Sequence, residues 1–197
     1  QKLFLFDEHL QRFKASLAKT FIPIPSELDN LENILKELHV KNNLLNQSFY
    51  IQITRGVQEA RSHTASQDLA PTVFINSQNL DINPYRGNKY EEGLRVRLED
   101  DIRWQRCDIK TTALIGNILS MHDPSLEKVD EIIFQKHGII NEGSKSNIFV
   151  VKKGKVYTPS LSQNILPGVT RNFIINLLKR NNIEILEEEI PVDSIYE

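Results

Sequence analysis

The sequence has one cysteine, Cys107, among 197 residues, and it contains no long apolar run. A single cysteine excludes an internal disulfide, which fits a reducing, cytoplasmic compartment. No stretch approaches the roughly 20 apolar residues of a membrane-spanning helix, so we expect no membrane association. The five histidines lack metal-ligand spacing, which predicts no metal site. A formal net charge of −2 provides no basic surface to attract nucleic acid.

The remaining composition is that of a globular protein, with 40% hydrophobic and 25% charged residues. Helical and strand-like patterns both occur, which predicts an α/β (α+β) fold with two domains. The turn-rich segment 79–88 is the expected boundary. We therefore predict a small N-terminal α+β domain over residues 1–83 and a larger C-terminal domain over residues 84–197. The chain opens in an apolar run and ends just after a helix-starting pattern, so we expect both domains to be incomplete.

Periodicity of the apolar residues predicts the individual elements. The expected helices cover residues 7–20, a segment starting at Ser26, 113–121 and 169–181. The expected strands cover residues 48–54, 72–77, 94–99, 131–137, 147–152, 155–158 and 183–186. We expect Lys153-Gly154 to form a tight turn between two of these strands. In the last helix, the apolar spacing predicts a buried stripe of Val169, Phe173, Leu177 and Leu178.

Lys110 is the first candidate for chemistry. It lies between an expected strand and an expected helix, with apolar Ile109 before it and two threonines after it. Partial desolvation at such a position lowers the pKa of an ammonium and makes the amine available as a nucleophile. A lysine taken at random is more often a solvated surface residue, so the residues downstream decide the interpretation.

Three other features of the sequence, one before Lys110 and two after it, admit both a structural and a functional interpretation. Glu142 precedes Gly143 at an expected strand end, where it is either an exposed turn residue or a carboxylate that acts on a bound ligand. Gly168-Val169-Thr170 opens the last helix, and this helix N-terminus is either an ordinary cap or an anion site. Arg12 lies beside the apolar stripe of the first helix, where it either extends to solvent or grips an anion.

The combined motifs decide between these interpretations. Lys110, the segment Asn141-Glu142-Gly143-Ser144-Lys145-Ser146-Asn147 and the segment Ile165-Leu166-Pro167-Gly168-Val169-Thr170-Arg171 occur in one order. This set resembles the fold-type IV (class IV) pyridoxal-phosphate aminotransferases, and most closely the D-amino acid aminotransferases. The resemblance implies a homodimer that uses pyridoxal 5'-phosphate. It also implies transamination between a D-amino acid such as D-alanine and a 2-oxo acid such as 2-oxoglutarate.

The resemblance also implies roles for particular residues. Lys110 would bind the cofactor covalently and move the Cα proton of the substrate, and Glu142 would face the pyridine nitrogen. The remaining cofactor contacts would be to the phosphate or beside the ring, from Arg12, Leu166, Val169 and Thr170.

The loop residues Arg61 and His63 indicate the subfamily. D-amino acid aminotransferases carry an Arg-x-His pair here that binds the substrate α-carboxylate, whereas a solvated loop is the structural alternative. A branched-chain L-amino acid aminotransferase and an aminodeoxychorismate lyase remain alternatives, because they share the cofactor machinery. A non-catalytic binding module is a third alternative, and the side-chain preference of the substrate stays open.

Overall fold

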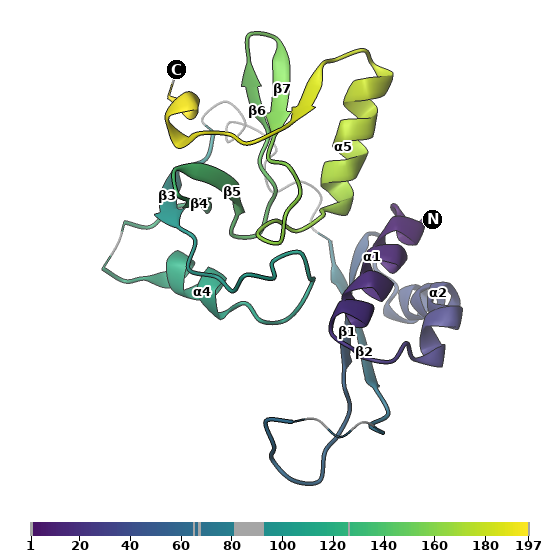
Figure 1. Cartoon of the computed structure of the whole chain (residues 1–197). Coiled ribbons are helices and arrows are strands. Elements are labelled where there is room, and N and C mark those ends of the chain that lie inside the picture. Colours follow the sequence, from purple (N-terminus) through teal and green to yellow (C-terminus); the bar gives the residue numbers. More distant parts are fainter. Residues whose placement is uncertain (1, 65, 67, 81–92, 126, 197) are drawn as a thin grey trace. The chain divides into compact units, whose positions relative to one another are not determined.

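The computed structural model describes residues 2–64, 66, 68–80, 93–125 and 127–196. It divides into two compact units (Figure 1). Unit 1 consists of residues 1–13 and 92–197, and unit 2 consists of residues 14–91. Helix α1, Phe6–Lys19, contributes to both units. The predicted domain boundary between residues 83 and 84 lies outside the described residues and stays a prediction.

Unit 2 combines helices with a two-stranded ribbon. Its elements after α1 are η1 (Ser26–Asn30), α2 (Leu31–Asn42), β1 (Gln47–Thr54) and β2 (Thr72–Asn79). The two strands are antiparallel, from the pair Gln47↔Asn79 to the pair Thr54↔Thr72. Four leucines, each at most 3% exposed, form the core: Leu17, Leu28, Leu31 and Leu35. The helix expected from Ser26 is therefore a 3₁₀ turn first, and the α-helix begins only at Leu31.

The first sheet of unit 1 holds the most deeply buried apolar residues. It consists of β3 (Val96–Asp100), β4 (Glu131–Lys136) and β5 (Ile139–Gly143), and helix α4 (Ile115–His122) precedes β4. Strand β4 is the central strand, parallel to β3 and antiparallel to β5. Ile132, Phe134 and Ile140 are almost completely buried. A core at the centre of this sheet gives rigid support to the polar residues at the end of β5.

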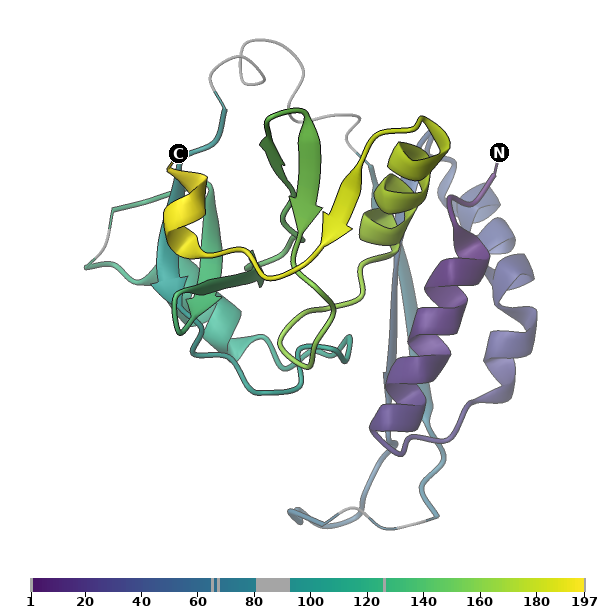
Figure 2. The same cartoon turned by 45° about the horizontal axis from the view of Figure 1, so that its top comes forward.

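The second sheet of unit 1 includes two strands that are connected through helix α5. It consists of β6 (Val150–Lys152), β7 (Lys155–Thr158) and β8 (Ile185–Glu187), with α5 (Val169–Arg180) between β7 and β8 and η2 (Val192–Ile195) after β8. Strands β7 and β8 are parallel, so α5 is their crossover helix (Figure 2). The segment before α5 leads from the end of β7 to the helix N-terminus.

The structure corrects several sequence predictions. Strand β5, Ile139–Gly143, was not among the strand ranges expected, although Glu142 was expected at the end of a strand. The strand expected over residues 147–152 is shorter and begins at Val150. The turn at Lys153-Gly154 is confirmed, with φ of +50° and +78°.

The buried stripe of α5 was also predicted wrongly. Val169 is buried as expected, but the other buried residues of the helix are Arg171 and Ile175. Phe173 and Leu177 are partly exposed, and the Phe173 ring meets that of Phe4 edge-on at 5.5 Å. Arg171 is buried because its Nη2 donates to Glu187 Oε2 at 2.9 Å and to Pro159 O at 2.8 Å. A charged residue thus takes an interior position that a hydrophobicity pattern assigns to a leucine.

Candidate active site

Glu142 lies at the centre of the candidate site. It is on β5, its side chain is 6% exposed, and both of its carboxylate oxygens accept hydrogen bonds. Oε1 accepts from Nη1 of Arg103 at 2.7 Å. Oε2 accepts from Nδ2 of Asn147 and from the backbone N–H of Leu166, each at 3.0 Å. The carboxylate is therefore held in one orientation by donors from three separate segments.

Arg103 is shared between two buried acids. Its Nη2 donates to Asp101 Oδ2 at 2.7 Å and its Nε to Asp101 Oδ1 at 2.9 Å, a bidentate arrangement. The guanidinium carbon also lies 4.5 Å from the ring centroid of Phe134, within the range of a cation–π contact. One arginine thus balances the charges of Asp101 and Glu142 below the surface.

The two acids respond to this environment in opposite directions. Burial raises the pKa of Glu142 above its usual value, although the hydrogen bond and charge of Arg103 act against that rise. Burial would also raise the pKa of Asp101, but hydrogen bonds from Arg103 and Asn141 and the charge of Arg103 hold it below its usual value. The arginine therefore stabilises the charge of Asp101 more fully than that of Glu142.

Lys110 belongs to the same electrostatic cluster. Desolvation lowers its pKa, the positive charge of Arg12 lowers it further, and the negative charge of Glu142 opposes both. Arg12 on α1 is itself half-buried, and desolvation lowers its pKa as well. The structure thus brings Lys110 into electrostatic range of both Arg12 and Glu142 within unit 1. Lys110 is nevertheless an exposed residue. A lowered pKa makes its amine more available as a nucleophile or a proton acceptor.

The N-terminus of α5 adjoins this cluster through Leu166. The first N–H groups of the helix precede its first intrahelical bond, which runs from Asn172 N to Gly168 O at 3.0 Å. Gly168, at the N-cap, has no side chain with which to bond them. Val169 is buried and Thr170 is exposed, so the threonine hydroxyl and these N–H groups can receive an anion.

Three residues of this site carried no role in the sequence interpretation. Asp101, Arg103 and Asn147 lie within or beside the motif segments, but nothing in their spacing indicates which groups they contact. The Arg103–Glu142 pair joins β5 to a loop that lies 39 residues earlier. Such a contact depends on how the sheet is assembled, and only the structure shows it.

Arg61 and His63 lie in the other unit. Both are exposed and belong to the connection between β1 and β2. The structure describes each unit separately. The predicted contact of Arg61 and His63 with a substrate carboxylate therefore stays a prediction.

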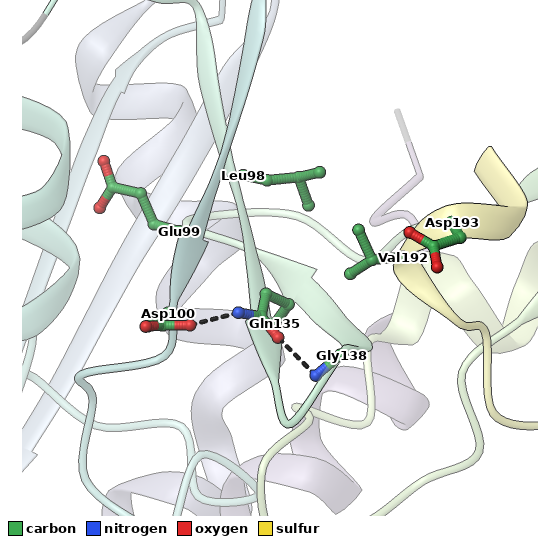
Figure 3. Close-up of a pocket in the computed structure, with 7 residues that line it drawn as sticks. All are labelled: Leu98, Glu99, Asp100, Gln135, Gly138, Val192 and Asp193. Carbon is green, nitrogen blue, oxygen red and sulfur yellow. Dashed lines mark hydrogen bonds between the residues drawn. The ribbon is translucent and has the colours of Figure 1, made fainter. Parts of the chain in front are cut away.

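A hollow in the described part of unit 1 is lined by none of these residues. It measures about 420 Å³ and is lined by Leu98, Glu99, Asp100, Gln135, Gly138, Val192 and Asp193 (Figure 3). Gln135 donates to Asp100 and accepts from the N–H of Gly138 at 2.8 Å, so its polar groups are satisfied within the protein. The lining is acidic and open, and it contains none of the candidate site residues.

Among the described residues, no group of three or more histidine, cysteine, aspartate or glutamate side chains is arranged to hold a metal ion. Over the same part of the chain, every helix is too short or too polar to cross a membrane.

Comparison with known sequences identifies relatives. The family model described as amino-transferase class IV matches residues 1–197. The D-alanine aminotransferase of Listeria monocytogenes serotype 1/2a is 33% identical over 196 residues, which cover 100% of this chain and 68% of that protein. The D-alanine aminotransferase of Staphylococcus aureus strain N315 is 32% identical over 192 residues, covering 98% and 67%.

Solved structures share the fold. The branched-chain amino acid aminotransferase of Escherichia coli superposes with a TM-score of 0.79 at 26% identity, covering 96% of this chain and 64% of that one. A putative 4-amino-4-deoxychorismate lyase of Legionella pneumophila gives 0.84 at 18% identity, covering 98% and 70%, and this likeness shows the fold alone. The chain thus spans about two thirds of the length of its relatives.

The mixed helix and strand fold of the type IV aminotransferases, expected from the sequence, is confirmed. The match over the full chain also confirms the family expected from the motifs. The chain belongs to the class IV aminotransferases, enzymes that use pyridoxal 5'-phosphate as their cofactor.

Proposed function

We propose that this protein transfers the amino group of a D-amino acid such as D-alanine to a 2-oxo acid such as 2-oxoglutarate. The observation that carries this proposal is the buried carboxylate of Glu142, which accepts three hydrogen bonds and lies within electrostatic range of Lys110, a lysine with a lowered pKa. The choice of D-substrates rests on the D-alanine aminotransferases at 31 to 33% identity and on the exposed pair Arg61 and His63.

The residues present fit pyridoxal 5'-phosphate. Thr170 and the first N–H groups of α5 suit the phosphate, which is a dianion, and Arg12 adds a positive charge. Glu142 Oε1 accepts one hydrogen bond from Arg103, so a second acceptor position on that oxygen suits a protonated ring nitrogen. Leu166 is held beside Glu142 by its own N–H, which suits a residue packed near the ring. When bound, the cofactor would supply an electron-withdrawing ring that makes the proton on the substrate Cα acidic.

The chain's own groups then handle the proton. Lys110 would hold the cofactor covalently, and after the substrate amino group has displaced it, its free amine would accept the Cα proton. Desolvation lowers the pKa of Lys110, and the positive charge of Arg12 lowers it further, which makes the neutral amine easier to form. Glu142 would hold a proton on the ring nitrogen through a hydrogen bond, while Arg103 and Leu166 fix its orientation. Arg61 and His63 would bind the substrate carboxylate.

The first experiment is a visible absorption spectrum of the purified protein with added pyridoxal 5'-phosphate, followed by D-alanine or L-leucine. We expect a visible band that disappears with D-alanine alone. Loss of the band with L-leucine alone would replace the proposal with a branched-chain L-amino acid aminotransferase. A protein that takes up no cofactor would contradict the proposal and favour a binding module.

Lys110→Ala gives the matched test of the central residue. We expect this variant to lose the visible band and all turnover, whereas Lys128→Ala, which removes an exposed lysine of the same unit, should keep both. Borohydride reduction followed by peptide mass mapping should place the added mass on the peptide that contains Lys110. Turnover in Lys110→Ala would contradict the assignment.

We also propose that the active form is a homodimer in the bacterial cytoplasm. Helix α4 leaves Ile115, Ile118 and Leu119 between 50% and 69% exposed, an apolar surface that a second copy of the chain would cover. Light scattering should give the mass of two chains. Ile118→Asp should shift that mass toward one chain, and an unchanged mass would place the interface elsewhere.

A further inference from the structure

Asn147 connects the two parts of the site that bind different ends of the proposed cofactor. Its Nδ2 donates to Oε2 of Glu142 and also to the backbone oxygen of Leu166, each at 3.0 Å. Glu142 lies on β5, and Leu166 lies in the segment that leads into α5. The amide group of Asn147 therefore links the carboxylate of Glu142 to the segment that precedes α5.

The connection is closed by a third hydrogen bond. The N–H of Leu166 donates to the same Oε2 of Glu142 at 3.0 Å. The Asn147 amide, the carboxylate of Glu142 and the peptide groups of Leu166 thus form a ring of hydrogen bonds. Because a ring constrains each member through two neighbours, Leu166 cannot move relative to Glu142 without breaking at least one bond to a charged group, the stronger kind.

Gly168 shows that the helix start is packed against Asn147 itself. A Cβ at residue 168 would lie 2.0 Å from Oδ1 of Asn147 and 3.2 Å from its Cγ. The backbone of Gly168, with φ −64° and ψ 132°, is extended and suits any residue. Arg171 Cβ would also lie 3.2 Å from this Cβ, so the closest obstacle to a side chain at position 168 is Asn147 Oδ1, and the conformation of the chain is not the obstacle.

We propose that Asn147 is a positioning residue that fixes the N-terminus of α5 relative to the carboxylate of Glu142. This inference rests on the proposed function and deepens it. In a ligand that carries both a ring nitrogen and a phosphate ester, the two groups are separated by a fixed distance. The Asn147 contacts set the matching distance in the protein, so that one ligand satisfies both subsites at once.

The test compares pyridoxal 5'-phosphate with pyridoxal, which lacks the phosphate. Their affinities are measured by titrating the fluorescence of the protein and the absorption of the ligand. In Asn147→Ala we expect the affinity for pyridoxal to fall about 10-fold, because Glu142 loses a donor to its charged oxygen. The ratio of the affinity for pyridoxal 5'-phosphate to that for pyridoxal should also fall about 10-fold, because the N-terminus of α5 is no longer held in place relative to Glu142. Asn147→Ser, a milder change, should shift both quantities in the same direction.

The control is Asn117→Ala. Asn117 Nδ2 donates to Ser144 O at 2.6 Å, so it makes the same kind of amide-to-carbonyl bond without touching Glu142 or the α5 segment. We expect both affinities to stay within about 2-fold of the wild type. If Asn147→Ala lowered the affinities for the two ligands by the same factor, or left both affinities unchanged, the positioning role would be overturned. A wild-type protein that binds neither ligand would instead overturn the proposed function.

A double-mutant cycle tests the contact from the opposite side. Gly168→Ala should weaken binding of pyridoxal 5'-phosphate about 10-fold or more, because the new Cβ displaces the Asn147 side chain. In an Asn147→Ser background, the same Gly168→Ala change should have less than about a 3-fold effect, since most of the clashing atoms are gone. Additive effects of the two substitutions would show that Gly168 and Asn147 act independently and would contradict the proposal.

Discussion

Nη1 of Arg103 donates to Oε1 of Glu142 at 2.7 Å, and both side chains are only 6% exposed. The same guanidinium is bonded to Asp101, whose side chain is equally buried. Two acids therefore depend on one cation for their charge balance. Removing one member of such a group leaves buried charge without compensation, which is more costly than losing a surface ion pair.

Arg103→Leu should lower the free energy of unfolding by about 3–5 kcal/mol, because Asp101 and Glu142 would remain buried without a counter-charge. Urea denaturation followed by circular dichroism measures the change. Arg106→Leu is the matched control, since Arg106 pairs with Asp108 at a more exposed position and should change stability by about 0–1 kcal/mol. Similar losses in the two variants would show that the buried group contributes no more than a surface pair.

Asp101 should make stability depend on pH in the acid range. Its folded pKa lies below the unfolded value of about 3.9, so its contribution is fully present above that pH and is lost as the pH falls through the folded pKa. The pKa of Glu142 is raised, so its effect on stability depends on pH in the opposite way. Its contribution to stability is present below the unfolded pKa and is lost as the pH rises through the folded pKa.

Asp101→Asn separates these two effects. The variant should be clearly less stable than the wild type at pH 7, and the difference should narrow as the pH falls below about 4. Free energies of unfolding in urea at several pH values measure it. A difference that stayed constant with pH would show that the charge of Asp101 has no part in the stabilisation.

Glu131 should be required for the turn that follows Glu142. It is buried, its Oε1 accepts from the N–H of Ser144 at 3.1 Å and from the Ser144 hydroxyl, and its Oε2 accepts from Ser146 Oγ at 3.0 Å. Glu131→Gln places an amide N–H₂ where an acceptor is needed, so we expect a loss of about 1–3 kcal/mol in unfolding free energy.

Glu184→Gln is the control for this prediction. Glu184 accepts from Lys155 Nζ at 2.8 Å, but both side chains are about half exposed, so the loss of unfolding free energy should be much smaller than in Glu131→Gln. Thermal and urea unfolding of the two variants in one buffer makes the comparison. Equal values would mean that the buried turn tolerates the amide.

Arg61→Ala should separate substrate binding from cofactor binding. If Arg61 binds the substrate carboxylate, KM for D-alanine should rise about 10-fold or more while the affinity for pyridoxal 5'-phosphate stays within about 2-fold. Steady-state kinetics and cofactor titration measure the two quantities. Arg95→Ala, at a side chain that is 68% exposed, is the control and should change neither. Equal losses of substrate and cofactor affinity would assign Arg61 a structural role instead.

Local patterns predicted much of the fold. The first and last long helices were expected over residues 7–20 and 169–181, and they cover Phe6–Lys19 and Val169–Arg180. The strand expected over residues 155–158 has those bounds. These elements carry their signal within one turn or one strand of sequence, through apolar spacing and turn residues. The local sequence pattern was therefore sufficient to predict these elements.

The contacts of the site could not be predicted in this way. Lys110 and Glu142 were found because each lies in a motif, but Arg103 and Asn147 were not, because their partners belong to distant segments. The same limit explains Arg171, whose burial depends on Glu187 in a strand that follows the whole helix. Hydrophobic periodicity describes which face of an element is apolar, and it carries no information on which polar residues meet inside.

The division of unit 1 into two stretches of sequence has a consequence for how the protein is made. Residues 14–91 are contiguous, so their ribbon and helices can assemble while the rest of the chain is still being synthesised. Phe4, in contrast, contacts a residue that emerges much later, Phe173. Bringing such distant residues together closes a long loop and slows folding. Phe4 can therefore reach its final contact with Phe173 only after α5 has been synthesised.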